Sequence, residues 1–528
     1  MKKKFYLLLV SAMVAFAVTV NAQLPTGFTN IDINNIDAGI SSTNDLFWDF
    51  SNAKFEVPKG SGLHSIFSGG MWIGGLDNGG IAHMASQTYR QTGNDFWPGP
   101  IDTMMGVATD WNLWDRSWKL NKTEVLDHIQ NYSNSGYVVP QNIAEWPGYD
   151  AALGRVLAPF ADYNSNGIYD PANGDYPYIL GDQTVYSIYN DLYTHSESTC
   201  DSLGVEVHRT LFGFDAPNDT ALNNTIFSRY EIKNFSNTDY HDVYISTWID
   251  FDLGNATDDY IGTDINLNMI YAYNGDNNDE TSMGYGLNPP AIGVYFLNDS
   301  LTSSMSYDNI SNAVTGNPAF CLDFMNYSRS IWLDNQPLTY GGDGRNPGNP
   351  VTTHIYPGVT NPIYFQAFGP WDEANSGNAP GDRRMIGSIG PLNLNAGDYK
   401  SFDIGYTWAR ATSGGPLASV AALQNAVSGL RVMYNNGVLT SIPVIPTTEA
   451  SLITVFPNPA SDEITIQNSN TDKQYKIKIE DAVGRIVYQK TNINENKYSI
   501  DVRDFSKGLY IVTVVKSGIS YNKKLILK

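Results

Sequence analysis

Glu463-Ile464-Thr465-Ile466-Gln467 alternates polar with apolar residues, and Tyr475-Lys476-Ile477-Lys478-Ile479-Glu480 does the same a few positions later. Alternation with a period of two directs one set of side chains to a buried sheet face and the other to solvent. Four more short runs of strand-forming residues follow, at 485–488, 498–502, 509–515 and 521–527. Turn residues separate the runs at regular intervals, which is typical of a small sandwich. We therefore expect residues 452–528 to form an immunoglobulin-like β-sandwich.

Four short motifs mark this stretch. In chain order they are Val455-Phe456-Pro457-Asn458-Pro459-Ala460, Asp481-Ala482-Val483-Gly484-Arg485, Lys507-Gly508-Leu509-Tyr510 and Lys523-Lys524-Leu525-Ile526. Together they resemble the type A C-terminal sorting domain of the type IX secretion system of Bacteroidota. The residues that carry the resemblance are Pro457, Asn458, Pro459, Gly484, Gly508, Tyr510, Lys523 and Lys524. The resemblance implies an export signal that the secretion machinery reads at the outer membrane; the alternative is an ordinary accessory sandwich.

The first residues predict the same route. Lys2-Lys3-Lys4 is followed by an apolar run from Phe5 to Val18 and by Val20-Asn21-Ala22, the pattern of a signal peptide over residues 1–22. The apolar run is shorter than a membrane span requires, so a membrane anchor is the weaker alternative. We expect a protein that crosses the periplasm, is secreted or held at the outer cell surface, and makes no stable membrane insertion.

Charge separates the two parts of the chain. Residues 23–451 contain 17 basic and 46 acidic residues, a net charge of −29, whereas residues 452–528 contain 12 basic and 8 acidic residues. So acidic a surface repels nucleic acid and anionic membranes. Such a surface suits divalent cations, although a need for solubility could by itself account for the excess of acidic over basic residues.

Residues 23–437 are predicted to form a multi-strand β-sandwich-type body with few short helices, which makes the chain all-β. Ile66 to Gly75, rich in glycine, aromatic and β-branched residues, is expected to be a buried strand. One amphipathic helix is predicted from the 3-4-3-4 spacing of Val420, Leu423, Val427, Leu430 and Tyr434. Residues 438–451, with two prolines, are predicted to be a linker.

Asp162-x-Asn164-x-Asn166-Gly167-x-x-Asp170 places oxygen ligands at alternate positions with glycine at the sixth, the spacing of loops that wrap Ca²⁺. Asp175 could add a further carboxylate. The twelfth position is Asn173 rather than Glu, and Pro171 prevents a regular helix start, so the loop resembles the helix-free calcium loops of extracellular repeat proteins. The alternative is a polar loop of Asx-turns without a cation.

A second acidic stretch follows a predicted strand. Five carboxylates fall within 15 positions and would repel one another unless a cation or solvent relieves them. These residues are Asp250, Asp252, Asp258, Asp259 and Asp264. We expect a second Ca²⁺ site here. The alternative is that two of these carboxylates are the acid and base of a glycosidase.

Other features leave alternatives open. Trp97, Trp111, Trp114 and Trp118 could stack on sugar rings, but burial in a core is the more common use of such residues. Cys200 and Cys321 could form a disulfide in an oxidising compartment. The sequence contains neither H-E-x-x-H nor G-x-S-x-G, so no catalytic residue is predicted.

Parts of residues 62–437 resemble a group of large secreted Bacteroidota proteins of unknown role. The segments that carry the resemblance begin at Ser68, Asp162, Gly174 and Asp250, and it transfers no activity. The sequence therefore predicts a calcium-stabilised, non-catalytic surface or binding protein exported by the type IX machinery, whose body binds a glycan or another surface protein. The alternative is a secreted polysaccharide hydrolase that uses paired Asp carboxylates.

Overall fold

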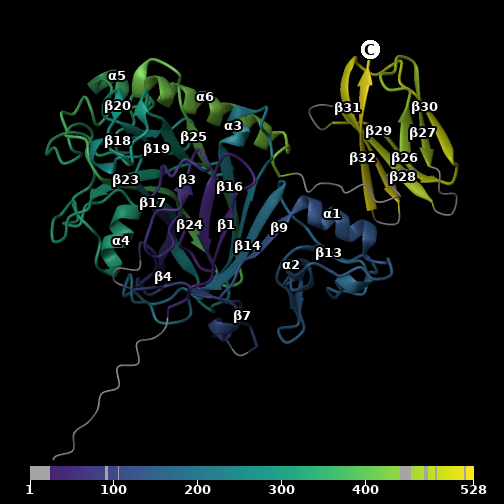
Figure 1. The fold of residues 1–528 in the computed structure, drawn as a ribbon, viewed down its shortest axis with the longest axis horizontal. Helices are drawn as coiled ribbons and strands as arrows, with labels where there is room; N and C mark the ends of the chain where they lie inside the picture. The colour runs from purple at the N-terminus through teal and green to yellow at the C-terminus, as the bar shows by residue number, and fades with distance from the viewer. Residues whose placement is uncertain are drawn as a thin grey trace, which may run out of the picture. The chain divides into compact units, whose positions relative to one another are not determined.

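The structure, a computed structural model, describes residues 24–89, 93–104, 106–440, 453–468, 474–481, 485–516 and 519–528. The chain divides into two compact units, Met1–Thr440 and Ser441–Lys528, called here the body and the tail unit (Figure 1). Both are built of antiparallel sheets with few helices, which confirms the all-β prediction. The predicted signal peptide and nearly all of the predicted linker lie outside the described residues.

The larger sheet of the body has nine strands. Eight follow one another across the sheet, and β9 (Trp118–Asn121) pairs with β14 beside β6. In spatial order the eight are β18 (Asp259–Asp264), β19 (Met269–Asn274), β22 (Ala291–Phe296), β25 (Tyr399–Ala409), β16 (Thr225–Asn234), β15 (Val205–Gly213), β14 (Gln183–Asn190) and β6 (Trp97–Pro98).

The second sheet of the body has five strands, and β1 (Phe28–Ile31), β2 (Asp37–Ser41) and β3 (Phe55–Glu56) form a further small sheet. In spatial order the five are β23 (Ser303–Asp308), β24 (Arg383–Leu394), β17 (Tyr240–Phe251), β4 (Ser68–Asp77) and β5 (Ala82–Ala85). Side chains from both larger sheets share one buried core, among them Trp72 and Trp248 of the five-stranded sheet and Tyr230 and Ile292 of the nine-stranded one. The main body is therefore a sandwich.

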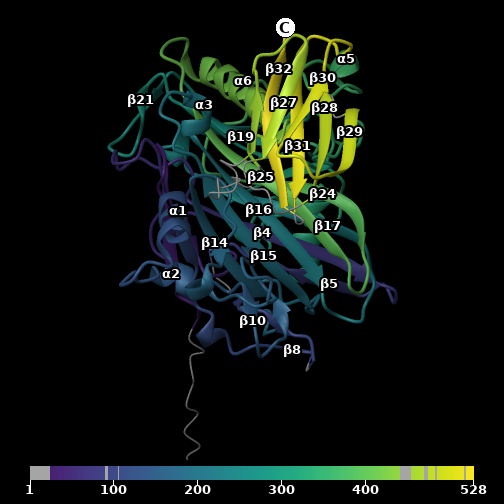
Figure 2. The ribbon, with the colours of Figure 1, turned by 90° about the vertical axis from the view of Figure 1, so that its right-hand side faces the viewer.

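Strand alternation gives the nine-stranded sheet a second buried face. On β22, Ile292 and Val294 face the five-stranded sheet, whereas Ala291 and Tyr295 face the other way. Helix α6 (Gly415–Asn435) packs on that outer face against β19, β22 and β25, and its Leu423 belongs to the same outer cluster. The body thus has three layers, as the views in Figures 1 and 2 agree, and the helix predicted from 3-4-3-4 spacing is confirmed.

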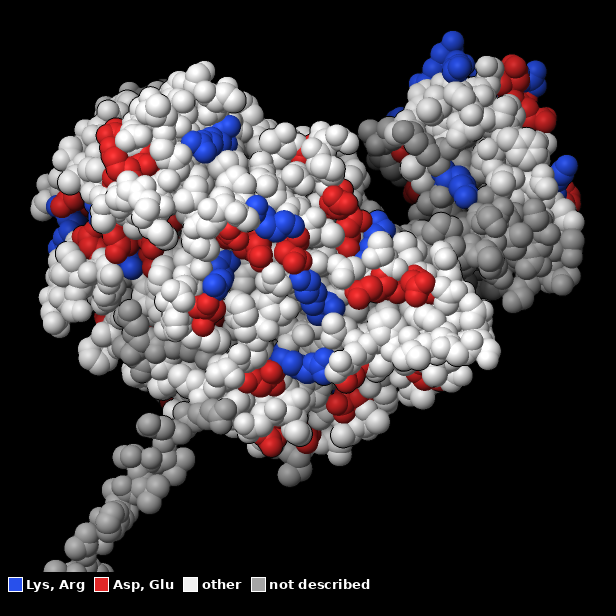
Figure 3. Space-filling model, viewed as in Figure 1, with Lys and Arg blue, Asp and Glu red and all other residues white. Residues whose placement is uncertain are grey.

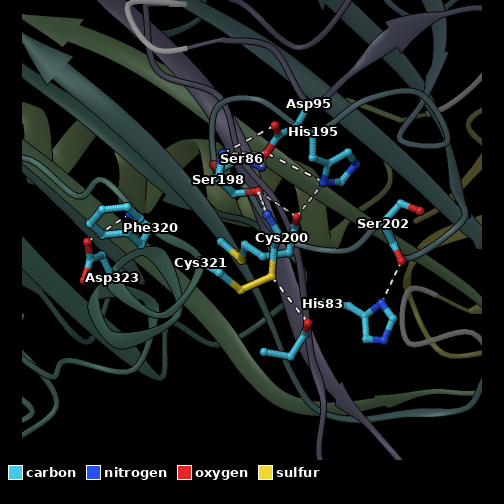
Figure 4. The surroundings of a disulfide bond; sticks show 12 residues. His83, Ser86, Asp95, His195, Ser198, Cys200, Ser202, Phe320, Cys321 and Asp323 are labelled. Atoms are coloured by element: carbon cyan, nitrogen blue, oxygen red, sulfur yellow. Dashed lines mark hydrogen bonds and ion pairs between the residues drawn. A yellow bond between two sulfur atoms is a disulfide. The ribbon is translucent and has the colours of Figure 1, made fainter.

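A disulfide between Cys200 and Cys321 settles the alternative that the sequence left open. Cys200 lies in the connection from β14 to β15, and Cys321 is the first residue of α4 (Cys321–Ser328), which packs on the five-stranded sheet. Figure 4 shows the bond beside Ser198, whose hydroxyl donates to the Met84 carbonyl at 3.0 Å. The bond therefore joins segments that are 121 residues apart.

In its described residues the tail unit contains seven strands in two sheets, close to the pattern that the sequence predicts. One sheet has the order β26-β27-β30 and the other β29-β28-β31-β32. The strands are β26 (Ile453–Phe456), β27 (Glu463–Asn468), β28 (Tyr475–Asp481), β29 (Ile486–Ile493), β30 (Lys497–Asp501), β31 (Gly508–Lys516) and β32 (Ile519–Leu527). Alternate residues such as Ile464, Ile477 and Val512 form a buried core of its own.

Two of the motifs make hydrogen bonds within the tail unit, and the first of them holds the last strand. The Asn458 side chain accepts a hydrogen bond from Ile526 N at 2.9 Å, and Ala460 N donates to the Ile526 carbonyl at 2.9 Å. Tyr510, almost fully buried, donates its hydroxyl proton to the Ser506 carbonyl at 2.6 Å. Gly484 lies outside the described residues. Among the helices in the part of the chain that the structure describes, none combines the length and apolar character needed to cross a bilayer.

Candidate cation sites in the acidic loops

The Asp162 loop connects β12 (Phe160–Ala161) to the 3-10 helix η2 (Pro171–Asn173) and lies mostly in solvent. Its backbone turns through positive φ at Ser165 and Gly167, at 60° and 81°. The Asp162 carboxylate accepts hydrogen bonds from Asn166 N at 3.1 Å and Gly167 N at 2.8 Å. The carboxylate of the first position thus closes the loop over its own backbone, an arrangement that the alternative of a polar loop without a cation also predicts.

The side chains at alternate positions of this loop meet at Asp170. Its carboxylate accepts hydrogen bonds from the amide groups of Asn164 at 3.1 Å, Asn166 at 3.0 Å and Asn173 at 2.9 Å. The hydrogen bond from Asn173 is the largest of the effects that hold the pKa of Asp170 below its usual range. Three amide donors therefore surround the carboxylate where a cation would otherwise supply positive charge.

Asp175 ties the end of the loop to its beginning. It is fully buried, and it accepts hydrogen bonds from Tyr163 N and Asp170 N, both at 2.8 Å. Burial raises the pKa of Asp175. Hydrogen bonds thus link the five residues predicted for this site, but the carboxylates of Asp162, Asp170 and Asp175 do not lie within 4.8 Å of one another. Their side chains are of the kind that a hard cation binds. The amide nitrogens of Asn164 and Asn166 face Asp170, and a 180° rotation of each amide group would present its oxygen to a cation instead.

The second acidic stretch divides among three places. Asp250 is at the end of β17, nearly fully buried, and it forms an ion pair with Arg384 at 3.1 Å. Arg384 also pairs with Asp382 and donates to the Tyr89 hydroxyl at 2.5 Å. The neighbouring Arg383 forms an ion pair with Glu373 at 2.9 Å.

Asp250, Asp252 and Asp382 form a carboxylate cluster in which one ligand atom of each lies within 4.8 Å of the others. Burial and the neighbouring Asp382 together raise the pKa of Asp252 to about 7, against the opposing effect of Arg384. Burial likewise raises the pKa of Asp250 well above its usual value. The Arg384 guanidinium already supplies much of the positive charge at this cluster, so a cation there stays a prediction.

Asp258 and Asp259 lie outside the cluster of Asp250, Asp252 and Asp382. Asp259 is the first residue of β18, and Asp258 immediately precedes it. Both oxygens of Asp258 and Oδ1 of Asp259 are buried and accept no well-aligned hydrogen bond from the described residues. Burial raises the pKa of Asp259 strongly, and Asp258, Asp252 and Asp279 raise it further. Burial also raises the pKa of Asp279, to about 6. Leu253 N donates to the other oxygen of Asp259 at 2.9 Å. Buried carboxylate oxygens with few donors are costly, and a cation would relieve that cost.

Asp264 belongs to neither group. It lies at the end of β18, where its carboxylate accepts from Leu267 N at 3.1 Å and from the Gln424 side chain of α6 at 2.9 Å. The sequence did not predict a role for Asp279 or Asp382. Asp279 follows the polar loop from Asn274, and Asp382 immediately precedes Arg383, but only the fold brings them beside the other carboxylates.

The tryptophan-rich segment is mainly part of the packed interior. Trp97 and Trp118 are buried, and Trp111 and Trp114 are half-buried. Trp97 contacts Trp111 with ring centroids 5.5 Å apart, and Trp114 contacts Trp118 at 6.2 Å. The structure therefore favours burial over a surface of exposed rings for sugar stacking.

The charged side chains on the visible face of the body are spread in several clusters, and a number of the acidic ones lie beside Lys or Arg (Figure 3). Partly exposed ion pairs of the body include Lys119 with Asp32 and Arg345 with Asp334. The negative charge is thus distributed over many small groups.

Residues 454–528 match the family model described as a secretion system C-terminal sorting domain. The match confirms the resemblance that the four motifs carry, and it identifies the tail unit as an export signal. It does not extend to the body. The sequence matches no curated protein.

Two solved structures are similar to parts of the chain. One is a DUF3244 family protein with an immunoglobulin-like β-sandwich fold from Bacteroides vulgatus ATCC 8482, 23% identical over 14% of this chain and 80% of that chain, with a TM-score of 0.13. The other is a polysaccharide lyase, 8% identical over 67% of this chain and 40% of that chain, with a TM-score of 0.20. The present chain thus spans less than half of the lyase. Neither similarity extends to an activity of this protein.

Proposed function

We propose, from the sorting domain at the end of the chain, that the body is the cargo of a type IX secretion system and acts outside the cell as a non-catalytic, calcium-stabilised surface or binding protein. The single observation that carries the export role is the match of residues 454–528 to a sorting domain. The tail unit has its own hydrophobic core, which suits a signal that can be removed without unfolding its cargo.

Deletion of residues 453–528 tests the export role. We expect the truncated chain to accumulate in the periplasm of a cell that carries the secretion system, because the machinery then has no domain to read. The measurement is the fraction of the protein at the surface or in the medium. Lys497→Gln, an exposed position on β30, is a matched control that should leave delivery unchanged. Normal delivery of the truncated chain would refute the export role.

The Asp162 loop supports the calcium part of the proposal. Hydrogen bonds of Asp162, Asp170 and Asp175 link its five oxygen-bearing residues within one short loop. A bound cation would be held by carboxylate and amide oxygens from these residues. Its positive charge would offset the negative charges of Asp162, Asp170 and Asp175, which otherwise depend on amide donors. A cation at this site would stabilise the folded loop and would take part in no reaction.

Thermal unfolding tests this site. A ligand that binds only the folded state at 100 times its dissociation constant stabilises it by about 2.7 kcal/mol. We therefore expect Ca²⁺ to raise the melting temperature of the body by several degrees over the value in chelator. Asp170→Asn should remove most of that difference, whereas Asp127→Asn on the nearby helix α1 (Lys122–Asn131) should preserve it. Identical melting temperatures with Ca²⁺ and with chelator would count against the site.

One observation favours the enzyme alternative. The pKa of Asp252, raised by burial to about 7, is in the range of a general acid beside the carboxylate of Asp382. Asp250 is less suited to that role, because it is buried and paired with Arg384. Turnover of a polysaccharide that is lost in Asp252→Asn would replace the non-catalytic proposal with a hydrolase.

A further inference from the structure

A cleft of about 900 Å³ opens on the outer face of the nine-stranded sheet. The strand residues that line it are Glu206 and His208 of β15, Glu231 and Lys233 of β16, and Tyr399 of β25. On the same strands, Val207 and Ile232 alternate with these residues and face the core between the two sheets. The cleft is therefore on the face that also carries α6.

Helix α6 covers only part of that face. The Tyr434 hydroxyl near its last turn donates to Asp403 at 2.6 Å, and Arg229 donates two hydrogen bonds to the same carboxylate, both at 2.8 Å. Glu231 and Lys233 follow Arg229 at alternate positions of β16, and their register partners are Ser401 and Tyr399. The strands thus continue past this contact with α6, and the face they present there becomes the floor of the cleft.

One wall of the cleft is fixed by a buried ion pair. Glu206, fully buried, accepts hydrogen bonds from both terminal nitrogens of Arg155, at 2.7 and 2.5 Å, and from Ile101 N at 2.6 Å. His208 Nε2 also lies 2.7 Å from Glu206 Oε1. The carboxylate is engaged on every side, so it does not repel an anion as a free carboxylate would.

Lys233 is the charged group of the cleft that faces solvent without a carboxylate partner among the described residues. Its ammonium lies 4.8 Å from the ring centroid of Phe235, and the Arg155 guanidinium lies 4.9 Å from the same centroid. Glu231 is occupied by the Tyr399 hydroxyl. The charge of Arg155 is balanced by Glu206, so Lys233 is the cation of this cleft that a ligand anion can reach, in a body whose net charge is strongly negative.

The remaining lining is largely apolar. Val156, Leu157 and Pro159 contribute to one side of the cleft. The Tyr399 side chain is 56% exposed, and the hydrogen bond to Glu231 restrains the ring. An exposed and restrained aromatic ring suits the apolar face of a sugar, and the volume suits several sugar units.

We propose that this cleft binds an acidic saccharide, with a carboxylate of the sugar held by Lys233 and a sugar ring packed on Tyr399. This inference rests on the binding function proposed above and names the class of ligand. Its test uses the purified full chain in solution, so its failure would leave the export and calcium proposals unaffected.

Calorimetric titration with an oligogalacturonate and with a neutral cello-oligosaccharide of the same length tests the proposal. We expect the acidic oligosaccharide to bind at least tenfold more tightly, with an affinity that falls as salt is added. Lys233→Gln should weaken that binding about tenfold, because it removes a charge-assisted contact. Lys54→Gln, which changes the same charge at a lysine paired with Asp49, should leave it unchanged.

Tyr399→Ala should weaken the acidic oligosaccharide as well, whereas Tyr399→Phe, which keeps the ring, should retain most of the affinity. Melting curves of each variant check that the fold is intact. Equal affinity for the two oligosaccharides, or no binding of the acidic one to folded wild-type protein at millimolar concentration, would overturn the proposal. An unchanged affinity in Lys233→Gln would overturn it too.

Discussion

Buried charges in the body are held by specific partners. Glu206 is paired with Arg155, Asp403 with Arg229, and Asp250 with Arg384. Removal of one member of such a pair leaves the other as an uncompensated buried charge. That charge destabilises the folded state more than the intact pair stabilises it. The fold therefore depends on these partners although each pair by itself adds little net stability.

Glu206 makes one of these dependences measurable through pH. Burial alone would raise its pKa, but the hydrogen bonds from His208 and Arg155 outweigh burial and lower the pKa from 4.5 to about 2. Because the folded pKa is lower than the unfolded one, the stabilisation is present above pH 4.5 and is lost as the pH falls toward 2. The full shift corresponds to roughly 3 kcal/mol, of which about 2 kcal/mol is lost by pH 3.

We expect Glu206→Gln to be less stable than wild type at pH 7 and to lose less stability between pH 7 and pH 3. Urea denaturation at both pH values measures the difference. Glu280→Gln, at an exposed position, should follow the wild-type profile. A Glu206→Gln variant whose stability falls with pH as steeply as that of wild type would show that another group dominates.

For individual residues, the sequence predicts part of the candidate sites. The five residues of the Asp162 loop are close in sequence, so their spacing alone predicts that they meet. Asp382 is distant in sequence from Asp250, and Asp279 from Asp259, and their places beside those carboxylates depend on strand pairing that no local pattern reveals. The cleft lined by Lys233 was missed for the same reason, because its residues come from three strands.

Among the elements, helix α4 is attached to the body through both packing and the disulfide. Its buried residues include Phe324 and Tyr327, and the Cys200–Cys321 bond joins its first residue to the segment before β15. A cross-link between residues 121 positions apart removes about 5 kcal/mol of conformational freedom from the unfolded chain in the loop-entropy account. The oxidising exterior expected of an exported protein would preserve the bond.

The double variant Cys200→Ala/Cys321→Ala should therefore be less stable than wild type by about 3 to 5 kcal/mol. Urea denaturation without reductant measures the loss. Reductant should lower the stability of wild type toward that of the variant and leave the variant unchanged. Equal unfolding midpoints for wild type and the variant would contradict the expected contribution of the bond.

Elements with a strong period were the easiest to predict. The alternating runs of the tail unit and the 3-4-3-4 helix were both found at nearly their observed bounds. The Ile66 to Gly75 segment was recognised as a strand, but its place between β17 and β5 could not be predicted. Pairing partners depend on contacts between distant segments, which the periodicity of one segment does not encode.

For the whole molecule, the two units are chemically different as well as structurally separate. The predicted cargo region carries a net charge of −29, whereas residues 452–528 carry 12 basic and 8 acidic residues. Each unit has its own buried core, and in the described residues no sheet contains strands of both. The fold class could be predicted because each unit bears its own pattern, whereas the three-layer arrangement of the body could not.

The position of β32 has a consequence for when the tail unit can take shape. The strand pairs with β31 along its whole length, and its residue Ile526 holds Asn458 and Ala460 from the beginning of the unit. Until the ribosome has added residues 519–527, the opening motif lacks these partners. A chain that ends before residue 519 would lack these contacts, so we expect a truncated copy to lack a folded sorting domain.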